Sequence, residues 1–441
     1  MTLKFNSLGC LYGGEQSVHF PMPLRVVLVL ILTVPFCEST WDFQRREINA
    51  NKRKIENYST KESSNEANIK EDTYLSTTEL ISKYGYPSEI HSVITQDGYI
   101  LEVHRIPRRR RATPVLLVHG LFDASSTWVL MGPDKGFAYM LYDQGYDVWL
   151  ANARGNTYSK KHITLSPSKP EFWNFTFHEI GIYDIPATID YILQRTTFKR
   201  LHYIGHSQGA STFFIMCSLR PEYNKKIISM QALGPAAFIG EGKSPIIQVM
   251  TYFEKQIINY FNSVGTYEFS TNNDFMKRIT SHFCKEGKST QALCSNVIFL
   301  LAGFDEDQMN STMLPVILGH YPAGASVKQV WHFSQLKNSG RFKQFDYGRN
   351  ENLQLYGRAT SPDYDLTKVV AKVAIHYAAN DYLVVPNDVE KLRRALPNVV
   401  GKYLVDFRQF NHIDFTWAVD ARELVYSKVI SLMRLIQNGD L

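Results

Sequence analysis

Apolar and polar positions change their spacing repeatedly along the chain from about Thr77 onward. Short runs of β-branched and other apolar residues predict strands, and apolar residues that recur every three or four positions predict helices. The strands predicted before Pro235 are His91–Thr95, Tyr99–Arg105, Val115–Val118, Tyr146–Leu150, His202–Gly205 and Ile228–Leu233. The helices predicted among them are Tyr183–Gln194 and Ala210–Leu219. Because strands that alternate with helices are joined by right-handed crossovers, we predict a mostly parallel central sheet.

The alternation stops after Pro235 and returns near residue 366, and helical patterns dominate the interval. The later elements predicted are the helices Pro245–Tyr260 and Ala292–Leu301, the strands Val373–Tyr377 and Tyr403–Phe407, and the helix Ala421–Gln437. A sheet that is interrupted by helices and then completed is one domain with an insertion. We therefore predict an α/β core formed by residues 77–237 and 366–441, with a helical cap at residues 238–365.

The first 76 residues predict a targeting signal and a linker or pro-segment rather than a part of the fold. The apolar run Val26–Phe36 follows Arg25 and precedes a stretch of small residues, which is the pattern of a secretory signal at residues 1–37. Met22 would begin a more compact signal, and a short buried or anchoring helix is the alternative interpretation. Residues 38–76 predict a disordered linker or pro-segment, because they lack the apolar surface that offsets the entropy of ordering.

Composition and charge exclude several classes of protein. Apolar residues make up 44% and charged residues 20% of the chain, which excludes a collagen-like or wholly disordered protein. No run of 18 or more apolar residues exists, which excludes a polytopic membrane protein. The net charge of +6 includes the run Arg108–Arg111, which predicts a solvated hairpin turn, with a processing site or a contact to an anionic surface as alternatives. We expect no nucleic-acid partner.

The glycosylation patterns and the cysteines are interpreted for a secreted protein. Three Asn-x-Ser/Thr patterns are candidate glycosylation sites at Asn57, Asn174 and Asn310, and its polar surroundings favour Asn310. The five cysteines are too few for a disulfide framework, and no pair has Cys-x-x-Cys spacing. A zinc ribbon or a thioredoxin-like site is therefore not expected.

The pentapeptide Gly205–Gly209, Gly-His-Ser-Gln-Gly, lies between a predicted strand and a predicted helix. In that setting Gly-x-Ser-x-Gly forms a tight nucleophile elbow, because larger side chains at the two glycine positions would collide with neighbouring backbone. The turn would project the Ser207 hydroxyl above the sheet edge, toward the N-terminal N–H groups of the following helix. We predict that Ser207 is a nucleophile, and that Gly205, His206 and Gly209 form its turn.

A serine hydroxyl needs a base, and in this architecture the chain order is serine, acid, histidine. Asp381 and His412 each follow a predicted strand, so both are expected at the carboxyl edge of the sheet, where α/β folds place their sites. Other residues compete for each role. The competing histidines are His119, His206 and His376, and the competing acids are Asp388, an expected helix N-cap, and Asp414, which is close to His412 in sequence.

The tetrahedral intermediate of acyl transfer needs two backbone N–H donors. One is expected from Gln208, the residue after the nucleophile, and the other from Leu121, in the loop after Val115–Val118. Because such a site works with side chains, backbone and water alone, we expect neither a metal ion nor an organic cofactor.

Several stretches of the chain resemble one family, the acid lipases, which comprise gastric lipase, lysosomal acid lipase and their insect relatives. These stretches include Thr95–Leu101, Leu117–Leu121, Trp149–Asn156, Tyr183–Tyr191, Gly205–Gly209 and Asn411–Trp417. The resemblance covers about residues 77–437 and implies the α/β-hydrolase fold. It places the nucleophile on Ser207, the acid on Asp381 and the base on His412. It places the oxyanion donors on Leu121 and Gln208.

The resemblance also implies what surrounds the site. Residues 238–365 would be the family's cap and lid, and the family's cap disulfide would join Cys284 to Cys294, although both could equally be free buried thiols. The implied function is a secreted or lysosomal lipase that hydrolyses neutral lipid esters, triglyceride or cholesteryl ester, at a lipid–water interface. Two alternatives stay open: a catalytically inactive lipid-binding or storage protein, and an esterase of small soluble esters.

Overall fold

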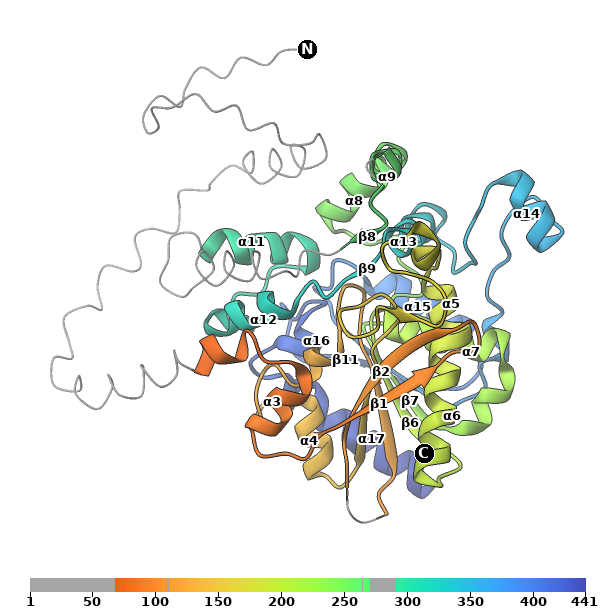
Figure 1. Cartoon of the computed structure of the whole chain (residues 1–441). Helices are drawn as coiled ribbons and strands as arrows, with labels where there is room; N and C mark the ends of the chain where they lie inside the picture. The colour runs from red at the N-terminus through yellow and green to blue at the C-terminus, as the bar shows by residue number, and fades with distance from the viewer. Residues whose placement is uncertain (1–67, 109–110, 264, 270–290) are drawn as a thin grey trace, which may run out of the picture. The chain divides into compact units, whose positions relative to one another are not determined.

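The computed structural model describes residues 68–108, 111–263, 265–269 and 291–441, all within one unit of the chain, Glu56–Leu441. A nine-stranded sheet forms its centre (Figure 1). Its strands are β1 (Glu89–Ile94), β2 (Tyr99–Ile106), β3 (Pro114–Val118), β4 (Asp147–Leu150), β5 (Lys161–His162), β6 (Leu201–His206), β7 (Ile227–Leu233), β10 (Val373–Tyr377) and β11 (Val399–Leu404).

The strand order is β1-β2-β4-β3-β6-β7-β10-β11, and β5 pairs with β2. Pairing is antiparallel from β1 through β2 to β4, and parallel from β4 onward to β11. The predicted mostly parallel sheet is therefore confirmed. The parallel strands bring the ends of β3, β6, β10 and β11 to one edge of the sheet.

Helices cover both faces of this sheet (Figure 1). The helices of the core are α3 (Thr77–Lys83), α4 (Phe137–Asp143), α5 (Phe177–Glu179), α6 (Ile185–Thr196), α7 (Gln208–Leu219), α15 (Pro386–Ala395), α16 (Asp414–Trp417) and α17 (Ser427–Asn438). Residues Ile180–Asp184 and Arg422–Tyr426 form wider π-helical turns that lead into α6 and α17.

The buried strand β3 shows how one short run serves two cores. Leu116 and Val118 pack with α6 and α7 on one face, whereas Val115 and Leu117 pack with α4 and α17 on the other. Successive side chains of a strand point to opposite faces, so a strand covered on both sides must be apolar at every position. This requirement explains why the run reads as continuously apolar rather than alternating.

The segment between β7 and β10 is mainly helical, as its sequence predicts. Its described helices are α8 (Pro245–Tyr252), α9 (Glu254–Ser263), α11 (Gln291–Ala302), α12 (Leu314–His320), α13 (Val327–Ser339) and α14 (Arg349–Tyr356). A two-stranded sheet joins β8 (Glu268–Phe269) to β9 (Ala325–Ser326). In Figure 1 helices α8, α9, α11 and α13 lie above one end of the central sheet. No helix among the described residues has the length and apolar character that crossing a membrane requires.

Two predicted elements differ from the observed ones. The helix predicted at Pro245–Tyr260 is two helices, which are separated by a turn at Phe253. The last strand is Val399–Leu404 rather than Tyr403–Phe407, because pairing with β10 begins at Val399. Gly401 interrupts its apolar pattern and hid it from the sequence analysis.

The ordered fold begins before residue 77, contrary to the predicted linker boundary. Asp72 and Thr73 are buried. The Asp72 carboxylate accepts a hydrogen bond from Lys83 at 2.7 Å. The backbone carbonyl of Asp72 accepts one from His320 Nε2 at 2.9 Å. Residues 68–76 therefore pack on the core. The rest of the predicted linker, the predicted signal with its alternative start at Met22, and Asn57 lie outside the described residues.

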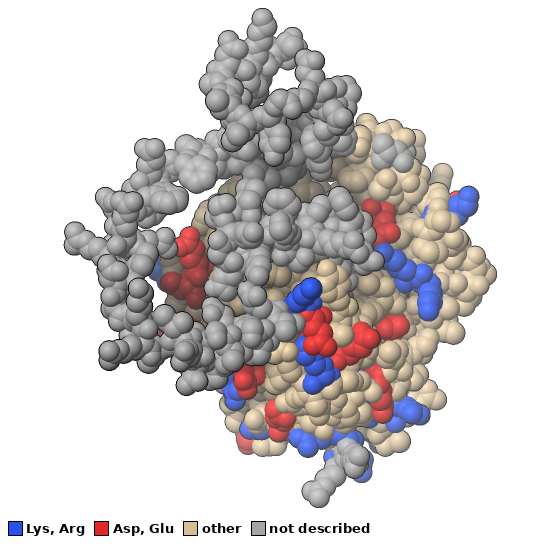
Figure 2. All heavy atoms as spheres, turned by 60° about the vertical axis from the view of Figure 1, so that its left-hand side comes forward, with Lys and Arg blue, Asp and Glu red and all other residues tan. Residues whose placement is uncertain are grey.

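The arginine run does not form a hairpin turn, because β4 lies between β2 and β3 in the sheet. Arg108 donates to the Tyr142 carbonyl and lies over the Tyr142 ring, 4.5 Å from its centroid. Arg111 lies 5.3 Å from the centroid of the Phe198 ring. Arg109 and Arg110 lie outside the described residues. On the face shown in Figure 2, basic and acidic side chains are intermixed, so the net positive charge does not gather there.

Candidate active site

Ser207 lies on a sharp turn between β6 and α7, as the pentapeptide predicts. Its backbone has φ 52° and ψ −118°, a strained conformation for a residue with a side chain. A Cβ atom at Gly209 would overlap the carbonyl oxygen of Val118, and one at Gly205 would lie 2.7 Å from the Ala210 nitrogen. Both glycines are therefore required by close backbone approach. The turn holds Ser207 at the carboxyl end of β6.

His412 connects Ser207 to Asp381 in one continuous line of hydrogen bonds. His412 Nε2 lies 2.8 Å from the Ser207 Oγ, and His412 Nδ1 lies 2.7 Å from Asp381 Oδ2. A carboxylate only accepts, so Nδ1 carries the proton and Nε2 is free to accept the serine proton. The structure thus brings together the three residues that the sequence analysis selected from segments 174 and 31 residues apart.

The second oxygen of Asp381 fixes the carboxylate. Asp381 Oδ1 accepts hydrogen bonds from the backbone N–H groups of Leu383 at 2.8 Å and Val384 at 2.7 Å. Asp381 follows β10 and is 1% exposed. With Oδ1 bound to two fixed donors, Oδ2 is oriented toward the imidazole of His412.

The competing acids have other partners. Asp388 does not cap its helix, because α15 begins at Pro386, a residue favoured at a first helical position. Its carboxylate instead accepts from the Glu241 N–H at 2.8 Å. Asp414 accepts from the Asn411 N–H at 2.6 Å, and burial raises its pKa well above the usual range. Asp414 therefore shapes the loop that carries His412.

The competing histidines also have structural contacts. His206 Nε2 donates to the His412 carbonyl at 2.9 Å, and burial lowers the pKa of His206 to about 3. His376 contacts Gln231 inside the sheet at 3.0 Å. His119 contacts the Gly120 carbonyl at 2.8 Å. None of these contacts reaches the Ser207 hydroxyl.

The backbone that carries the two predicted oxyanion donors lies close to Ser207. Gln208 is the first residue of α7, so its N–H is one of the four that lack a partner within the helix. The loop of Gly120 and Leu121 follows β3, and a Cβ atom at Gly120 would lie 3.3 Å from the Ser207 Cβ. Both backbone segments therefore lie within reach of an atom bonded to the Ser207 oxygen.

Comparison with known proteins identifies the family. Residues 113–419 match a family model described as alpha/beta hydrolase fold, and residues 77–132 match one described as a partial alpha/beta-hydrolase lipase region. Lipase 1 of Drosophila melanogaster is 47% identical over 374 residues, which are 84% of this chain and 82% of that protein. The chain belongs to the lipase family of α/β hydrolases.

More distant members of this lipase family match over similar lengths. The gastric triacylglycerol lipase of Bos taurus is 39% identical over 369 residues, 81% of this chain and 91% of that protein. Lipase member K of Homo sapiens is 38% identical over 374 residues, 83% of this chain and 92% of that protein. The protein is accordingly a serine ester hydrolase of the lipase class, with the fold that the sequence predicts.

The sequence also predicts a disulfide and glycosylation sites in this lipase. Cys284 lies outside the described residues, as does the side chain of Cys294, so their disulfide stays a prediction. Among the glycosylation candidates, Asn174 is exposed and Asn310 is half-buried. The Asn174 side chain accepts a hydrogen bond from Lys328 at 2.7 Å. Asn174 is thus more exposed than Asn310, which the sequence analysis preferred. Among the described residues, no cluster of three or more His, Cys, Asp or Glu side chains is arranged to hold a metal ion.

The sequence analysis missed residues that hold the two loops of the site together. The backbone of Ala302 and Gly303, just after α11, accepts from both loops: Tyr382 N–H bonds to the Ala302 carbonyl at 3.0 Å, and Asn411 Nδ2 to the Gly303 carbonyl at 3.0 Å. Asn380 Nδ2 donates to the carbonyls of Phe304 and Gln409. No local pattern predicts such contacts, because they join segments 29 to 108 residues apart.

Proposed function

We propose that this lipase hydrolyses the carboxylic ester bonds of neutral lipids, with Ser207 as nucleophile, His412 as general base and Asp381 as its orienting acid. The observation that carries the proposal is the continuous line from Ser207 Oγ through both nitrogens of His412 to Asp381 Oδ2, at 2.8 and 2.7 Å. A hydroxyl within hydrogen-bond reach of an oriented base is the arrangement that activates a serine.

In the first half of the reaction, Ser207 Oγ attacks the ester carbonyl while its proton moves to His412 Nε2. The imidazolium that forms is stabilised by the Asp381 carboxylate beside Nδ1. The C–O bond to the alcohol then breaks, and His412 gives its proton to the departing alkoxide. The products are an alcohol and an acyl ester on Ser207.

In the second half, water replaces the alcohol. His412 removes a proton from the water as its oxygen attacks the acyl carbonyl. The bond to Ser207 Oγ then breaks, Oγ recovers the proton from His412, and the fatty acid leaves.

The oxygen that becomes negative in both halves is assigned to the N–H groups of Leu121 and Gln208. These donors belong to backbone that is fixed before substrate arrives, so they stabilise charge without reorganisation. Loss of a single donor of this kind costs about 3–4 kcal/mol in other hydrolases. The positive end of α7 adds to the same field.

Neutral lipid is the proposed substrate class, and triglyceride and cholesteryl ester are its two members to be separated. Two relatives, from Bos taurus and Rattus norvegicus, are named gastric triacylglycerol lipase, which favours triglyceride. We further propose that the protein enters the secretory pathway, to be released or delivered to lysosomes. This proposal rests on the basic and apolar pattern that ends at Phe36.

The test is a substrate panel on the purified enzyme between pH 4 and 8. We expect rapid hydrolysis of an emulsified medium-chain triglyceride, a measurable rate on cholesteryl ester and a slower rate on a short soluble ester. Saturable hydrolysis of short esters with a negligible rate on emulsions would show an esterase instead. Binding of lipid without any ester hydrolysis would show a lipid-binding protein and overturn the proposal.

A further inference from the structure

The peptide that joins Gly120 to Leu121 is held by the side chain of the preceding residue. His119 directly follows β3 and is 3% exposed. Its Nδ1 lies 2.8 Å from the carbonyl oxygen of Gly120. A carbonyl oxygen only accepts hydrogen bonds, so the proton of the His119 ring is on Nδ1.

The contacts of the other ring nitrogen, Nε2, independently indicate the same tautomer. His119 Nε2 lies 3.1 Å from the backbone nitrogen of Ala153 and 3.3 Å from Nδ2 of Asn156. A backbone N–H only donates, so Nε2 must be unprotonated. Burial also lowers the pKa of His119 to about 4, which keeps the ring neutral above that pH. His119 is thus fixed in one tautomer and one orientation.

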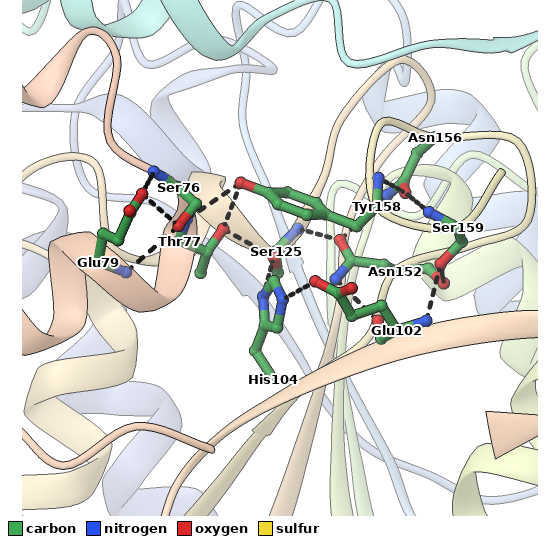
Figure 3. A network of polar contacts seen from close by, with 10 residues as sticks. All are labelled: Ser76, Thr77, Glu79, Glu102, His104, Ser125, Asn152, Asn156, Tyr158 and Ser159. Atoms are coloured by element: carbon green, nitrogen blue, oxygen red, sulfur yellow. Dashed lines mark hydrogen bonds and ion pairs between the residues drawn. The ribbon is translucent and has the colours of Figure 1, made fainter. Parts of the chain in front are cut away.

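The Asn156 amide is itself oriented by backbone (Figure 3). Its Oδ1 accepts from the N–H groups of Tyr158 at 3.0 Å and Ser159 at 3.2 Å, so Nδ2 must be the atom directed at His119. The same Nδ2 lies 3.1 Å from Oδ1 of Asn152. Each group that contacts His119 Nε2 is therefore a donor whose position is set elsewhere.

Asn152 ties these groups to a deeper polar network that includes Ser125, His104 and Glu102 (Figure 3). Asn152 Oδ1 accepts from the Ser125 N–H at 2.9 Å. Ser125 Oγ lies 2.8 Å from His104 Nδ1, and His104 Nε2 lies 2.7 Å from Glu102 Oε1. This line has the composition of a serine–histidine–acid relay. Ser125 and His104 are both fully buried, so it anchors the loop and is not a second reactive site.

We propose that His119 is a positioning residue of the oxyanion hole, which holds the Gly120–Leu121 peptide so that the Leu121 N–H points at the oxygen that becomes negative. The C=O and N–H of a trans peptide point in opposite directions. Holding the Gly120 carbonyl against His119 therefore turns the Leu121 N–H away from His119. The proximity of Gly120 to Ser207 places that N–H beside the nucleophile. The inference rests on the proposed function, which assigns Leu121 as a donor.

Three substitutions of His119 separate its two contacts. His119→Asn keeps an N–H donor near the position of Nδ1, where it can bond the Gly120 carbonyl. His119→Gln places its amide near the position of Nε2, where it can satisfy Ala153 but not Gly120. His119→Ala removes both contacts. We expect kcat on a soluble ester to fall about 10- to 100-fold in the Ala and Gln variants, and less in the Asn variant.

Two further readouts distinguish positioning from general loss of structure. KM should stay within about twofold, because the hole acts mainly on the transition state. The inhibition constant of an alkylboronic acid, which forms a tetrahedral anionic adduct with a serine, should rise by the same factor as kcat falls. His202→Ala is the matched control, since His202 is equally buried, has its pKa lowered to about 4, and contacts Ser229 and Gln437 instead.

The rates are expressed per active site, titrated with a fluorophosphonate, so that unfolded protein does not count. The control should lower the unfolding midpoint while keeping kcat near wild type. A His119→Ala kcat within threefold of wild type, or a Gln variant that recovers as much kcat as the Asn variant, would overturn the inference. If His119→Ala does not fold, the comparison of Asn with Gln decides alone. A wild type that hydrolyses no ester would instead overturn the proposed function, and the inference with it.

Discussion

Asp123 shows how strongly burial acts on single residues of this site. It lies two residues after Leu121, and burial raises the pKa of its carboxyl to about 7. Its Oδ1 accepts from the Ala124 N–H at 2.8 Å, and the Thr127 hydroxyl bonds the same carboxyl. A carboxylic acid in this environment stays protonated through the acidic range and becomes charged only near neutrality. The loop that follows β3 therefore carries a group whose charge opposes folding above pH 7.

This placement predicts the direction of a pH effect on stability. An unfolded aspartate titrates near pH 4, so between about pH 4 and 7 the folded protein holds a proton that the unfolded chain has released. The contribution of Asp123 to stability therefore falls as the pH rises through that window. In Asp123→Asn this dependence should disappear, and the variant should gain a few kcal/mol relative to wild type between pH 4 and 8. Urea unfolding of both proteins at pH 4 and at pH 8 measures this difference. Equal changes in the free energy of unfolding of the two proteins would contradict the prediction.

At the residue scale, the sequence sufficed wherever a role depends on local backbone. The elbow could be predicted because Gly205, Ser207 and Gly209 are constrained by a turn of five residues. The pairing of His412 with Asp381 needed the expected chain order and the strand ends as well. The roles of Asn152 and Asn156 could not be predicted, since they follow from the positions of backbone donors in other segments.

At the scale of elements, the exit from α11 is the point where the acid loop and the base loop meet. Gly303 has φ 123°, a region that favours glycine. A Cβ atom there would overlap the carbonyl oxygen of Asn380 and would lie 3.1 Å from the Cβ of Asn411. Asn380 precedes Asp381 and Asn411 precedes His412. This close packing explains how the helical insertion and the two loops keep a common geometry.

Gly303→Ala should therefore reduce activity by pushing the two loops apart. We expect kcat to fall at least tenfold, because displacement of the base by a fraction of an ångström weakens its bond to the nucleophile. Gly340→Ala is the matched control: Gly340 also has positive φ, at 62°, but no atom lies within 4 Å of an added Cβ. Initial rates on a soluble ester compare the two variants. Equal rates would show that the segment after α11 does not support the site.

Element boundaries were predictable where packing agrees with local pattern and not elsewhere. The strand Val373–Tyr377 was predicted at its observed limits, since every residue but the last is buried. The strand at Val399–Leu404 was misplaced because all of its side chains keep some exposure and Gly401 lies inside it. Its position is set by pairing with β10, which no local window contains.

At the scale of the molecule, the helical segment between β7 and β10 carries exposed aromatic side chains. Its helix α8 ends in two aromatic side chains that water reaches: Tyr252 is 81% and Phe253 36% exposed, with ring centroids 4.9 Å apart. Exposed aromatic pairs of this kind are unfavourable in water and favourable at a lipid surface. The sequence predicts a helical cap here, but not which apolar residues of its stripe face outward, because that depends on tertiary packing.

We predict that these two aromatic side chains support action on emulsions. The double substitution of Tyr252→Ser and Phe253→Ser should lower the rate on emulsified triglyceride about tenfold, while the rate on a short soluble ester changes less than twofold. Leu355→Ser is the matched control, because Leu355 is 58% exposed but belongs to α14, which Figure 1 shows apart from α8. A parallel loss on both substrates would argue against a surface role for the pair.

The central claim, that Ser207 is the nucleophile of ester hydrolysis, is tested most directly by covalent labelling. The enzyme is treated with an alkyl fluorophosphonate, and peptide masses and residual activity are followed together. The account predicts one label per molecule, on the peptide with Ser207, loss of activity in proportion, and no label in Ser207→Ala, whose turnover should fall on the order of 10⁴–10⁶-fold. A label on another residue, or a Ser207→Ala variant within tenfold of wild-type activity, would contradict it.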